Sequence, residues 1–542
     1  MDWYKKYYRK KAHSFRGDSL ENFDQRRARW RSIYVIYFTM FLMSLGFSIV
    51  LTGIYDYLQK KLDSTGVEFM TFAVAANPLG QMIFSPLIGW WSNKLGSSRL
   101  PMLITLAIFT FASGFYSILE ILPIESRKMA MLVSRFLVGV SSANIAVARS
   151  YLSAATRFSE RTHAVSMVSL AQVLGFVVGP ALQAAVTFLG PQGFYIFGLP
   201  INMYTSVGWI NVLLGILNFL LFLPGNFTEH KIAAREALKE QNDSNELSEE
   251  STWKSRKIDY VASWTLICAF LVFVFNFVLI ETLGSSLTMN QFAWTGKEAM
   301  YYVGIMMSVG ALIACGVFAM IGPICKRIAE RKVMMWGGFF CMFVGRLFMI
   351  PWGPDPPPIA EYGPFGNETM HANGTEKVGC PSIQEWCRYT PQMTITQFLI
   401  GYTFTTIGYP LGVSLTQTIF SKILGPRPQG VWMGLMTGAG CVSRILGPIC
   451  VGIIYNRYGT YHTFGVTGAT LVLCIIWLQI VDKRLIPLEE LEQQVNRDNN
   501  VEGCERRIIQ VPMKRMENQN HHTDSTRVPL NIDQENDKHI ED

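Results

Sequence analysis

The chain has 542 residues, of which 50% are hydrophobic and only 16% are charged, and its formal net charge is +7 at pH 7. Globular domains carry roughly 25% charged residues, so this composition excludes a disordered chain, a collagen, a coiled coil and a soluble basic protein. Nucleic-acid binding is excluded too, because long apolar runs separate the Lys and Arg residues instead of letting them cluster on one surface.

Twelve apolar stretches are long enough to cross a membrane, since a helical span needs about 20 predominantly apolar residues. They lie near residues 33–54, 70–91, 101–119, 129–151, 163–188, 203–224, 258–283, 299–321, 333–351, 392–420, 431–455 and 463–481. We therefore predict an all-α membrane protein with twelve transmembrane helices.

A polar stretch divides these spans into six and six. The predicted parts are a basic arm (1–32), an N-terminal half (33–224), a linker (225–257), a C-terminal half (258–481) with a long loop (352–391), and a mostly disordered tail (482–542). Of the 47 Lys and Arg residues, 35 fall in the arm, the tail and the five loops that twelve spans place on the same side. The positive-inside rule makes that side cytoplasmic and predicts that both termini lie in the cytoplasm.

The loop 352–391 then faces the lumen, and its composition agrees with this orientation. It contains two N-glycosylation sequons, at Asn367 and Asn373, and the cysteine pair Cys380 and Cys387. Glycans and disulfides are both typical of the secretory lumen, so we expect these modifications here. A third sequon, at Asn226, falls on the cytoplasmic side and should remain unmodified.

The sequence gives no support to an enzyme. The other eight cysteines show no C-x-x-C or His pairing, so we expect no metal. We find no phosphate-binding lysine loop, no G-x-S-x-G turn and no dinucleotide fingerprint, and so expect no cofactor. Transport of a small molecule or ion is the default function.

Two motifs recur in the two halves. The second span contains Gly80 and ends in a G-x-x-x-[D/N/K]-[K/R]-x-[G/A] pattern, which returns after the eighth span. The residues concerned are Gly89, Asn93, Lys94, Gly96 and Arg99 in the first half and Gly322, Lys326, Arg327 and Arg331 in the second. A glycine-proline motif also occurs twice, as Gly175, Gly179 and Pro180 in span five and as Gly447 and Pro448 in span eleven. The repetition indicates two pseudo-symmetric halves.

These motifs resemble the major facilitator superfamily, whose R-x-x-x-G motif is similar to Arg135 through Gly139 in span four. The resemblance implies two six-helix halves around a central transport path. It also implies a cytoplasmic gate at the loop after span two. Asn93 stands where the family usually has an aspartate that helps to latch this gate, which leaves the strength of the latch open.

Further stretches resemble a lysosomal branch of the superfamily linked to neuronal ceroid lipofuscinosis. They lie at 29–50, 201–204, 380–387 and 421–434, and the resemblance runs from about residue 29 to 484. It implies a lysosomal or late endosomal membrane and a branch for which chloride conduction has been proposed. No sorting signal with the usual spacing is present, so the predicted location depends on the resemblance.

Five ionisable residues fall inside the predicted spans: Arg135, Arg149, Glu281, Arg346 and Arg444. Each costs roughly 2.5–3.5 kcal/mol to insert, so each needs a function or a partner. Because four of the five are cations, we predict that an anion enters between the halves.

Each residue has an alternative interpretation. Arg149 could extend to the interface, Arg346 could anchor the luminal end of its span, and Arg135 could be structural or assist proton coupling. Arg444 has little room to extend and is expected to face a cavity. Glu281 could pair with an Arg or carry a proton.

The leading hypothesis is a transporter of a small anion such as chloride. The alternative is a proton-coupled exporter of a lysosomal breakdown product, such as a sugar or amino-acid derivative, and a membrane scaffold acting through its tails is a third. Membrane lipids are expected partners. The basic arm either lies on anionic lipid or acts only as a topology signal. The sequence does not identify a protein partner.

Overall fold

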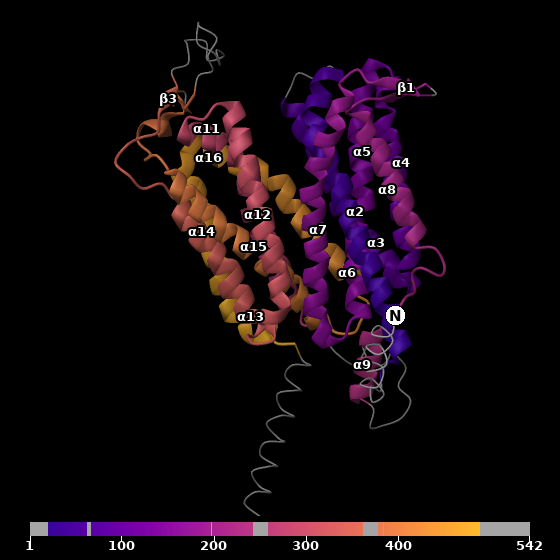
Figure 1. The fold of residues 1–542 in the computed structure, drawn as a ribbon. Coiled ribbons are helices and arrows are strands. Elements are labelled where there is room, and N and C mark those ends of the chain that lie inside the picture. The colour runs from indigo at the N-terminus through magenta and orange to yellow at the C-terminus, as the bar shows by residue number, and fades with distance from the viewer. Residues whose placement is uncertain are drawn as a thin grey trace, which may run out of the picture. The chain divides into compact units, whose positions relative to one another are not determined.

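The computed structural model describes residues 20–61, 67–196, 198–241, 258–360, 378–382 and 384–487. Most of these residues are helical (Figure 1). The longer helices are α2 (Phe23–Lys61), α3 (Val67–Leu95), α4 (Arg99–Ser117), α5 (Ile124–Ser142), α6 (Asn144–Ala155), α7 (Phe158–Val186), α8 (Thr205–Leu221), α9 (Ile232–Gln241), α11 (Tyr260–Phe292), α12 (Gly296–Cys325), α14 (Cys341–Met349), α15 (Ile395–Leu424) and α16 (Gly430–Val481). The shorter segments are η1 (Leu119–Ile121), η2 (Thr187–Leu189), α13 (Glu330–Lys332), the π-helix η3 (Val333–Phe340), η4 (Glu385–Arg388) and η5 (Asp482–Leu485).

Among the described residues, ten helical segments are long and apolar enough to cross a membrane, and α8 is a shorter apolar helix. Each predicted stretch overlaps one of these segments. α5 and α6 fall within one candidate span, and α13, η3 and α14 form another. α16 covers both of the last two predicted stretches, because two helices meet at Gly459, whose φ of 77° interrupts the helical geometry.

The first helix begins earlier than its apolar run. α2 starts at Phe23, within the stretch predicted to be a basic arm. Arg29 explains the difference: its side chain is 1% exposed and donates to Glu21 at 2.7 and 2.9 Å and to Glu160 at 2.9 Å. These ion pairs connect the start of α2 to α7, so Arg29 has a structural partner within the protein and is not free to contact lipid.

Four short strands were not predicted. β1 (Phe194–Ile196) and β2 (Leu199–Ile201) form an antiparallel pair between α7 and α8. β3 (Ile359–Ala360) and β4 (Cys380–Pro381) form a parallel pair that joins two parts of the predicted loop 352–391. Such short strands have no apolar periodicity long enough to be recognised in a sequence.

The glycine motifs lie where helices approach closely. α7 packs against α2, and a side chain at Gly175 would come within 2.5 Å of a backbone oxygen of α2. Gly179 also faces α2, whereas Gly80 and Gly139 lie at the crossing of α3 and α5. Gly447 faces Val278 of α11 across a looser contact. Pro180 and Pro448 lie within α7 and α16.

Candidate functional site

The two predicted halves meet where α3 ends and α16 begins. Asn93 lies near the end of α3, and its Oδ1 accepts a hydrogen bond of 2.9 Å from the backbone N–H of Gly430, the first residue of α16. Its Nδ2 donates to the backbone oxygen of Pro428 at 3.4 Å. Gly89, one turn earlier, packs so tightly on the Gly430 carbonyl that no side chain would fit between them. We call Gly89, Asn93, Pro428 and Gly430 the latch.

The latch binds a helix N-terminus without a charged side chain. The free N–H groups at the start of a helix carry a partial positive charge, which attracts an oxygen acceptor. The Asn93 amide oxygen supplies this acceptor in place of a carboxylate. Asn93 thus contacts the second half through its neutral amide.

A second contact joins the same ends of the halves. Glu330 of α13 accepts hydrogen bonds from Lys422 of α15, at 2.7 Å, and from the Thr162 hydroxyl of α7. Arg161, next to Thr162, donates to the backbone oxygen of Ser421 at 3.2 Å. α7 of the first half is thus tied to α13 and α15 of the second.

The remaining motif residues surround these contacts. Lys94 lies over the ring of Trp90, Gly96 forms a turn with φ of 63°, and Arg99 donates to the backbone oxygen of Phe222. In the second half, Gly322 packs on His163 of α7, Arg331 pairs with Asp482 at 2.6 Å, and Lys326 and Arg327 are exposed.

Further along α16, polar and charged residues from both halves converge. Arg149 of α6 donates to the Thr437 hydroxyl at 3.3 Å, and Cys441 donates to Oε1 of Gln81 in α3 at 3.3 Å. We define the central cluster by its side chains, which are Gln81, Arg149, Glu281, Tyr409, Thr437, Cys441 and Arg444.

Arg444 links this cluster to α11 and α15. Its guanidinium lies within electrostatic range of the Tyr409 hydroxyl, the carboxylate of Glu281 and the guanidinium of Arg149. The Tyr409 ring stacks on Phe277 with centroids 3.7 Å apart, which fixes the position of the hydroxyl.

The central cluster has an excess positive charge that a ligand could reach. Arg149 and Arg444 carry two positive charges against the single negative charge of Glu281. Arg444 and Glu281 are exposed and Arg149 is half-buried, so these groups are not sealed inside the protein. Guanidinium groups bind carboxylates and phosphates through paired hydrogen bonds and attract any anion.

The other two predicted arginines lie elsewhere. Arg135 is 1% exposed inside the N-terminal half, and its Nε and Nη2 have no hydrogen-bond partner among the described residues. With Ser113 and Asn211 it lines a cavity of about 10 Å³, which has room for about one water molecule. Arg346 is 0% exposed inside the C-terminal half, where it donates to the backbone oxygen of Asn276 and to the Met349 sulfur. The structure therefore does not bring these two residues to the central cluster.

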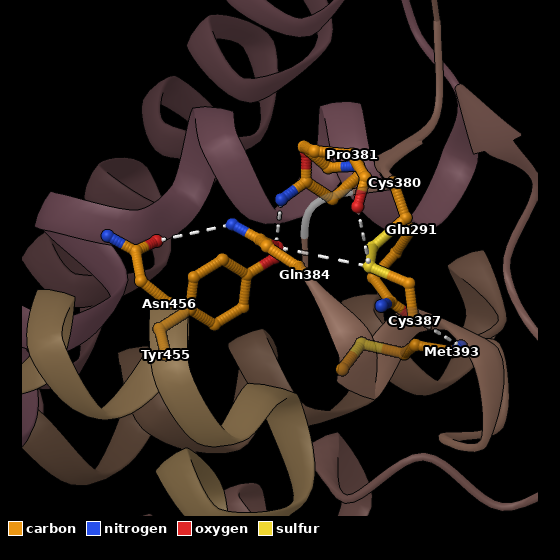
Figure 2. Close-up of a disulfide and its surroundings, with 9 residues drawn as sticks. Gln291, Cys380, Pro381, Gln384, Cys387, Met393, Tyr455 and Asn456 are labelled. Carbon is orange, nitrogen blue, oxygen red and sulfur yellow. Dashed lines mark hydrogen bonds between the residues drawn. A yellow bond between two sulfur atoms is a disulfide. The ribbon is translucent and has the colours of Figure 1, made fainter. Parts of the chain in front are cut away.

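The predicted cysteine pair, Cys380 and Cys387, is joined by a disulfide (Figure 2). The closed loop lies against the kink in α16, where Gln384 donates to Asn456 at 3.5 Å (Figure 2) and Trp386 packs on Gly459.

Gln291, at the end of α11, extends the same contact region. Its side-chain oxygen accepts a hydrogen bond of 2.8 Å from the backbone N–H of Met393, just before α15. The disulfide loop and the neighbouring segment thus contact the ends of several helices of the C-terminal half.

The three sequons differ in what the structure describes. Asn367 and Asn373 lie outside the described residues. Asn226 accepts a hydrogen bond from Arg31, and the next residue, Phe227, is 2% exposed. The sequon at Asn226 is therefore part of a folded contact with α2.

Sequence reasoning missed several of these residues. Tyr409 is not among the predicted site residues, and an aromatic hydroxyl directly before Pro410 within an apolar stretch was the available signal. Gln81, Thr437, Cys441 and Glu330 gave no sequence signal, because their roles depend on helix contacts. Within the described residues, no group of three or more His, Cys, Asp or Glu residues is placed to hold a metal.

Comparison with known proteins identifies the family. The model of the Major Facilitator Superfamily matches residues 36–365 and 383–513. The chain belongs to the major facilitator superfamily. It is similar to major facilitator superfamily domain-containing protein 8 of Xenopus laevis, with 38% identity over 487 residues, which cover 87% of this chain and 94% of that protein.

Solved structures of the superfamily have the same fold. The human organic anion transporter MFSD10 (TETRAN) gives a TM-score of 0.56 at 16% identity. The match covers 83% of this chain and 99% of the chain of that transporter. The proton:xylose symporter XylE gives a TM-score of 0.63 at 11% identity, with coverage of 86% and 99%. This superfamily member is a multi-pass membrane transporter.

Proposed function

We propose that the protein carries a small anion, such as chloride, between its two six-helix halves. The observation that supports this most is the excess positive charge of the central cluster, where Arg149 comes from the first half and Arg444 from the second. An anion bound between them would contact both halves at once. Binding energy that differs between two conformations can shift their populations, which is the requirement for alternating access.

The proposed topology has twelve spans with both termini in the cytoplasm. α8 is the sixth span, and α16 counts as two spans that meet at Gly459. The latch is then on the cytoplasmic side and closed, and the central path opens toward the lumen. The disulfide loop lies in the lumen of a lysosome or late endosome, a location that rests on the resemblance of the sequence to that branch.

The central cluster suggests a role for each side chain. Arg149 and Arg444 bind the anion, and Tyr409 orients the Arg444 guanidinium. Glu281 offsets one of the two arginine charges and leaves the cluster with one net positive charge, so that the anion is bound weakly enough to leave.

A second candidate is proton-coupled export of an uncharged or zwitterionic breakdown product. It is supported by Glu281, an exposed carboxylate within electrostatic range of Arg444. In this case Glu281→Gln would abolish uphill transport while any passive anion conductance remained.

The test is flux into liposomes containing the purified protein, measured for chloride and a panel of organic anions at two pH values. Hydrogen bonds to charged groups contribute about 1.5–3 kcal/mol. Arg444→Ala should therefore raise the anion concentration that gives half-maximal flux roughly 10- to 150-fold. Arg484→Ala is the matched control, because this arginine is 60% exposed and lies outside the cluster. The proposal fails if no anion moves, or if Arg444→Ala and the control give the same flux as the wild type.

A further inference from the structure

The segment between the halves is folded onto the N-terminal half. Phe227 is 2% exposed, and its ring lies 4.8 Å from that of Phe222 and 5.0 Å from that of Tyr151. α9 follows and buries Ile232, Ala233 and Ala237. A segment predicted to be a plain linker thus has its own apolar anchor, and this anchor fixes the residues between Phe227 and α9.

Glu229 lies between these two anchored parts. Its Oε1 accepts three hydrogen bonds: from the Ser97 hydroxyl at 3.0 Å, from the Ser98 N–H at 2.6 Å and from the Arg99 N–H at 2.7 Å. Arg99 is the first residue of α4, and the residue before it makes no side-chain cap. A carboxylate from the linker therefore caps this helix and meets its partial positive charge.

The turn that Glu229 holds leads directly to the latch. The N–H of Gly96 donates to the backbone oxygen of Asn93 at 3.3 Å, and the Ser92 hydroxyl donates to the backbone oxygen of Ser97 at 3.1 Å. These two bonds tie the end of α3 to the turn. Movement of residues 96–99 would consequently move Asn93 relative to Gly430.

We propose that Glu229 is a positioning residue of the latch. It fixes the turn after α3 and thereby aims the Asn93 amide at the first N–H of α16. Position 93 has no charge, and the carboxylate that steadies this loop is supplied by the linker between the halves. The inference deepens the proposed function, since the latch matters for transport only if the halves alternate.

The test is hydrogen–deuterium exchange of the full-length purified protein in lipid nanodiscs, without any substrate. A charge at a helix N-terminus changes the local equilibrium about two- to fivefold. Glu229→Gln keeps the shape and removes the charge. It should speed exchange by that factor both in the turn 96–99 and in the first turn of α16.

Two further variants separate positioning from general destabilisation. Glu236→Gln changes another linker acid, which accepts from the N–H of Phe158 at 2.9 Å, and it should speed exchange at the start of α7 only. Ser97→Ala removes one of the three hydrogen bonds and should give a smaller increase in the same two regions as Glu229→Gln. If Glu229→Gln does not fold, Ser97→Ala tests the same prediction.

A rescue variant completes the test. Asn93→Asp in the Glu229→Gln background should restore protection in the first turn of α16 but not in the turn 96–99. The inference is overturned if exchange at 96–99 rises while the first turn of α16 keeps its wild-type rate. Because no transport is measured, failure of the anion proposal would leave this result unaffected.

Discussion

Gly89→Ala is expected to open the latch. The added methyl group would overlap the carbonyl oxygen of Gly430, a backbone atom that a rotamer change cannot move aside. Overpacking of this kind costs about 1–3 kcal/mol, and here the cost falls only on the conformation in which α3 and α16 are together. The ratio of open to closed latch should then rise about 5- to 150-fold.

Cys441 is a natural reporter of this change. Its side chain is 2% exposed and donates to Gln81 across the two halves, so separation of α3 from α16 would expose the thiol. The assay is the rate of Cys441 alkylation by a small maleimide, quantified peptide by peptide with mass spectrometry. Cys474, which is buried within the C-terminal half, serves as the internal reference and should keep its rate.

Gly438→Ala is the matched control on the same pair of helices. A methyl group there would lie 3.4 Å from the backbone oxygen of Met82, an ordinary contact. Cys441 should therefore react at its wild-type rate in Gly438→Ala. An equal Cys441 rate in folded Gly89→Ala protein would refute the conclusion that this glycine permits closure.

Three other variants test the remaining features. Gly459→Ala should lower stability by about 1–3 kcal/mol, because φ 77° and ψ −167° is a region essentially confined to glycine. Gly452→Ala should not lower the melting temperature, because no described neighbour lies within 4 Å of the added methyl group; equal melting temperatures for the two variants would contradict this prediction. Replacing Cys380 and Cys387 by Ser should cost about 2–3 kcal/mol, given their separation of seven residues. The melting temperature of the double variant should then no longer respond to reductant. A response like that of the wild type would argue against stabilisation by this disulfide. Burial and the nearby positive charge of Arg29 lower the pKa of His230 below 6.5, although Glu21 partly opposes this. The folded state therefore favours neutral His230, and this stability is complete above pH 6.5 and is lost as the pH falls toward the lower folded pKa. The hydrogen–deuterium exchange rate of residues 226–236, corrected for the intrinsic rate, should rise as the pH falls from 7 to 5. This pH dependence should be absent in His230→Gln. A wild-type rate independent of pH would count against the lowered pKa.

The membrane helices were the most predictable part of the fold. Their signal is local, since about 20 apolar residues in succession can satisfy their backbone within one helix. Boundaries were harder to place, as α2 shows. Its first ten residues are mostly polar and were predicted to be an arm, because the sequence does not show that Arg29 has buried carboxylate partners.

The candidate site was predictable only in part. Charge inside an apolar run drew attention to Arg149, Glu281 and Arg444, which the structure places together. The same rule drew attention to Arg135 and Arg346, which lie inside separate halves. Hydrophobicity measures the cost of inserting a charge but not the direction in which the side chain points.

Contacts between the halves could not be predicted from one sequence. Asn93 and Gly430 are 337 positions apart, and neither residue type indicates the other. Glu229 was an unremarkable acid in a polar linker. Its role depends on where Phe227 and α9 are anchored, which only the packing of the helices determines.

The neutral latch has a consequence for how transport responds to its surroundings. An amide neither titrates nor attracts a layer of counterions, so salt and pH should not act directly on the bond between Asn93 and Gly430. Salt should weaken this bond only through Glu229, whose carboxylate holds the turn after α3. Any dependence of transport on acidity must then arise at groups other than the Asn93 amide. Opening and closing at α3 and α16 would then depend on the fit of Gly89 against Gly430 and on how firmly Glu229 holds the turn.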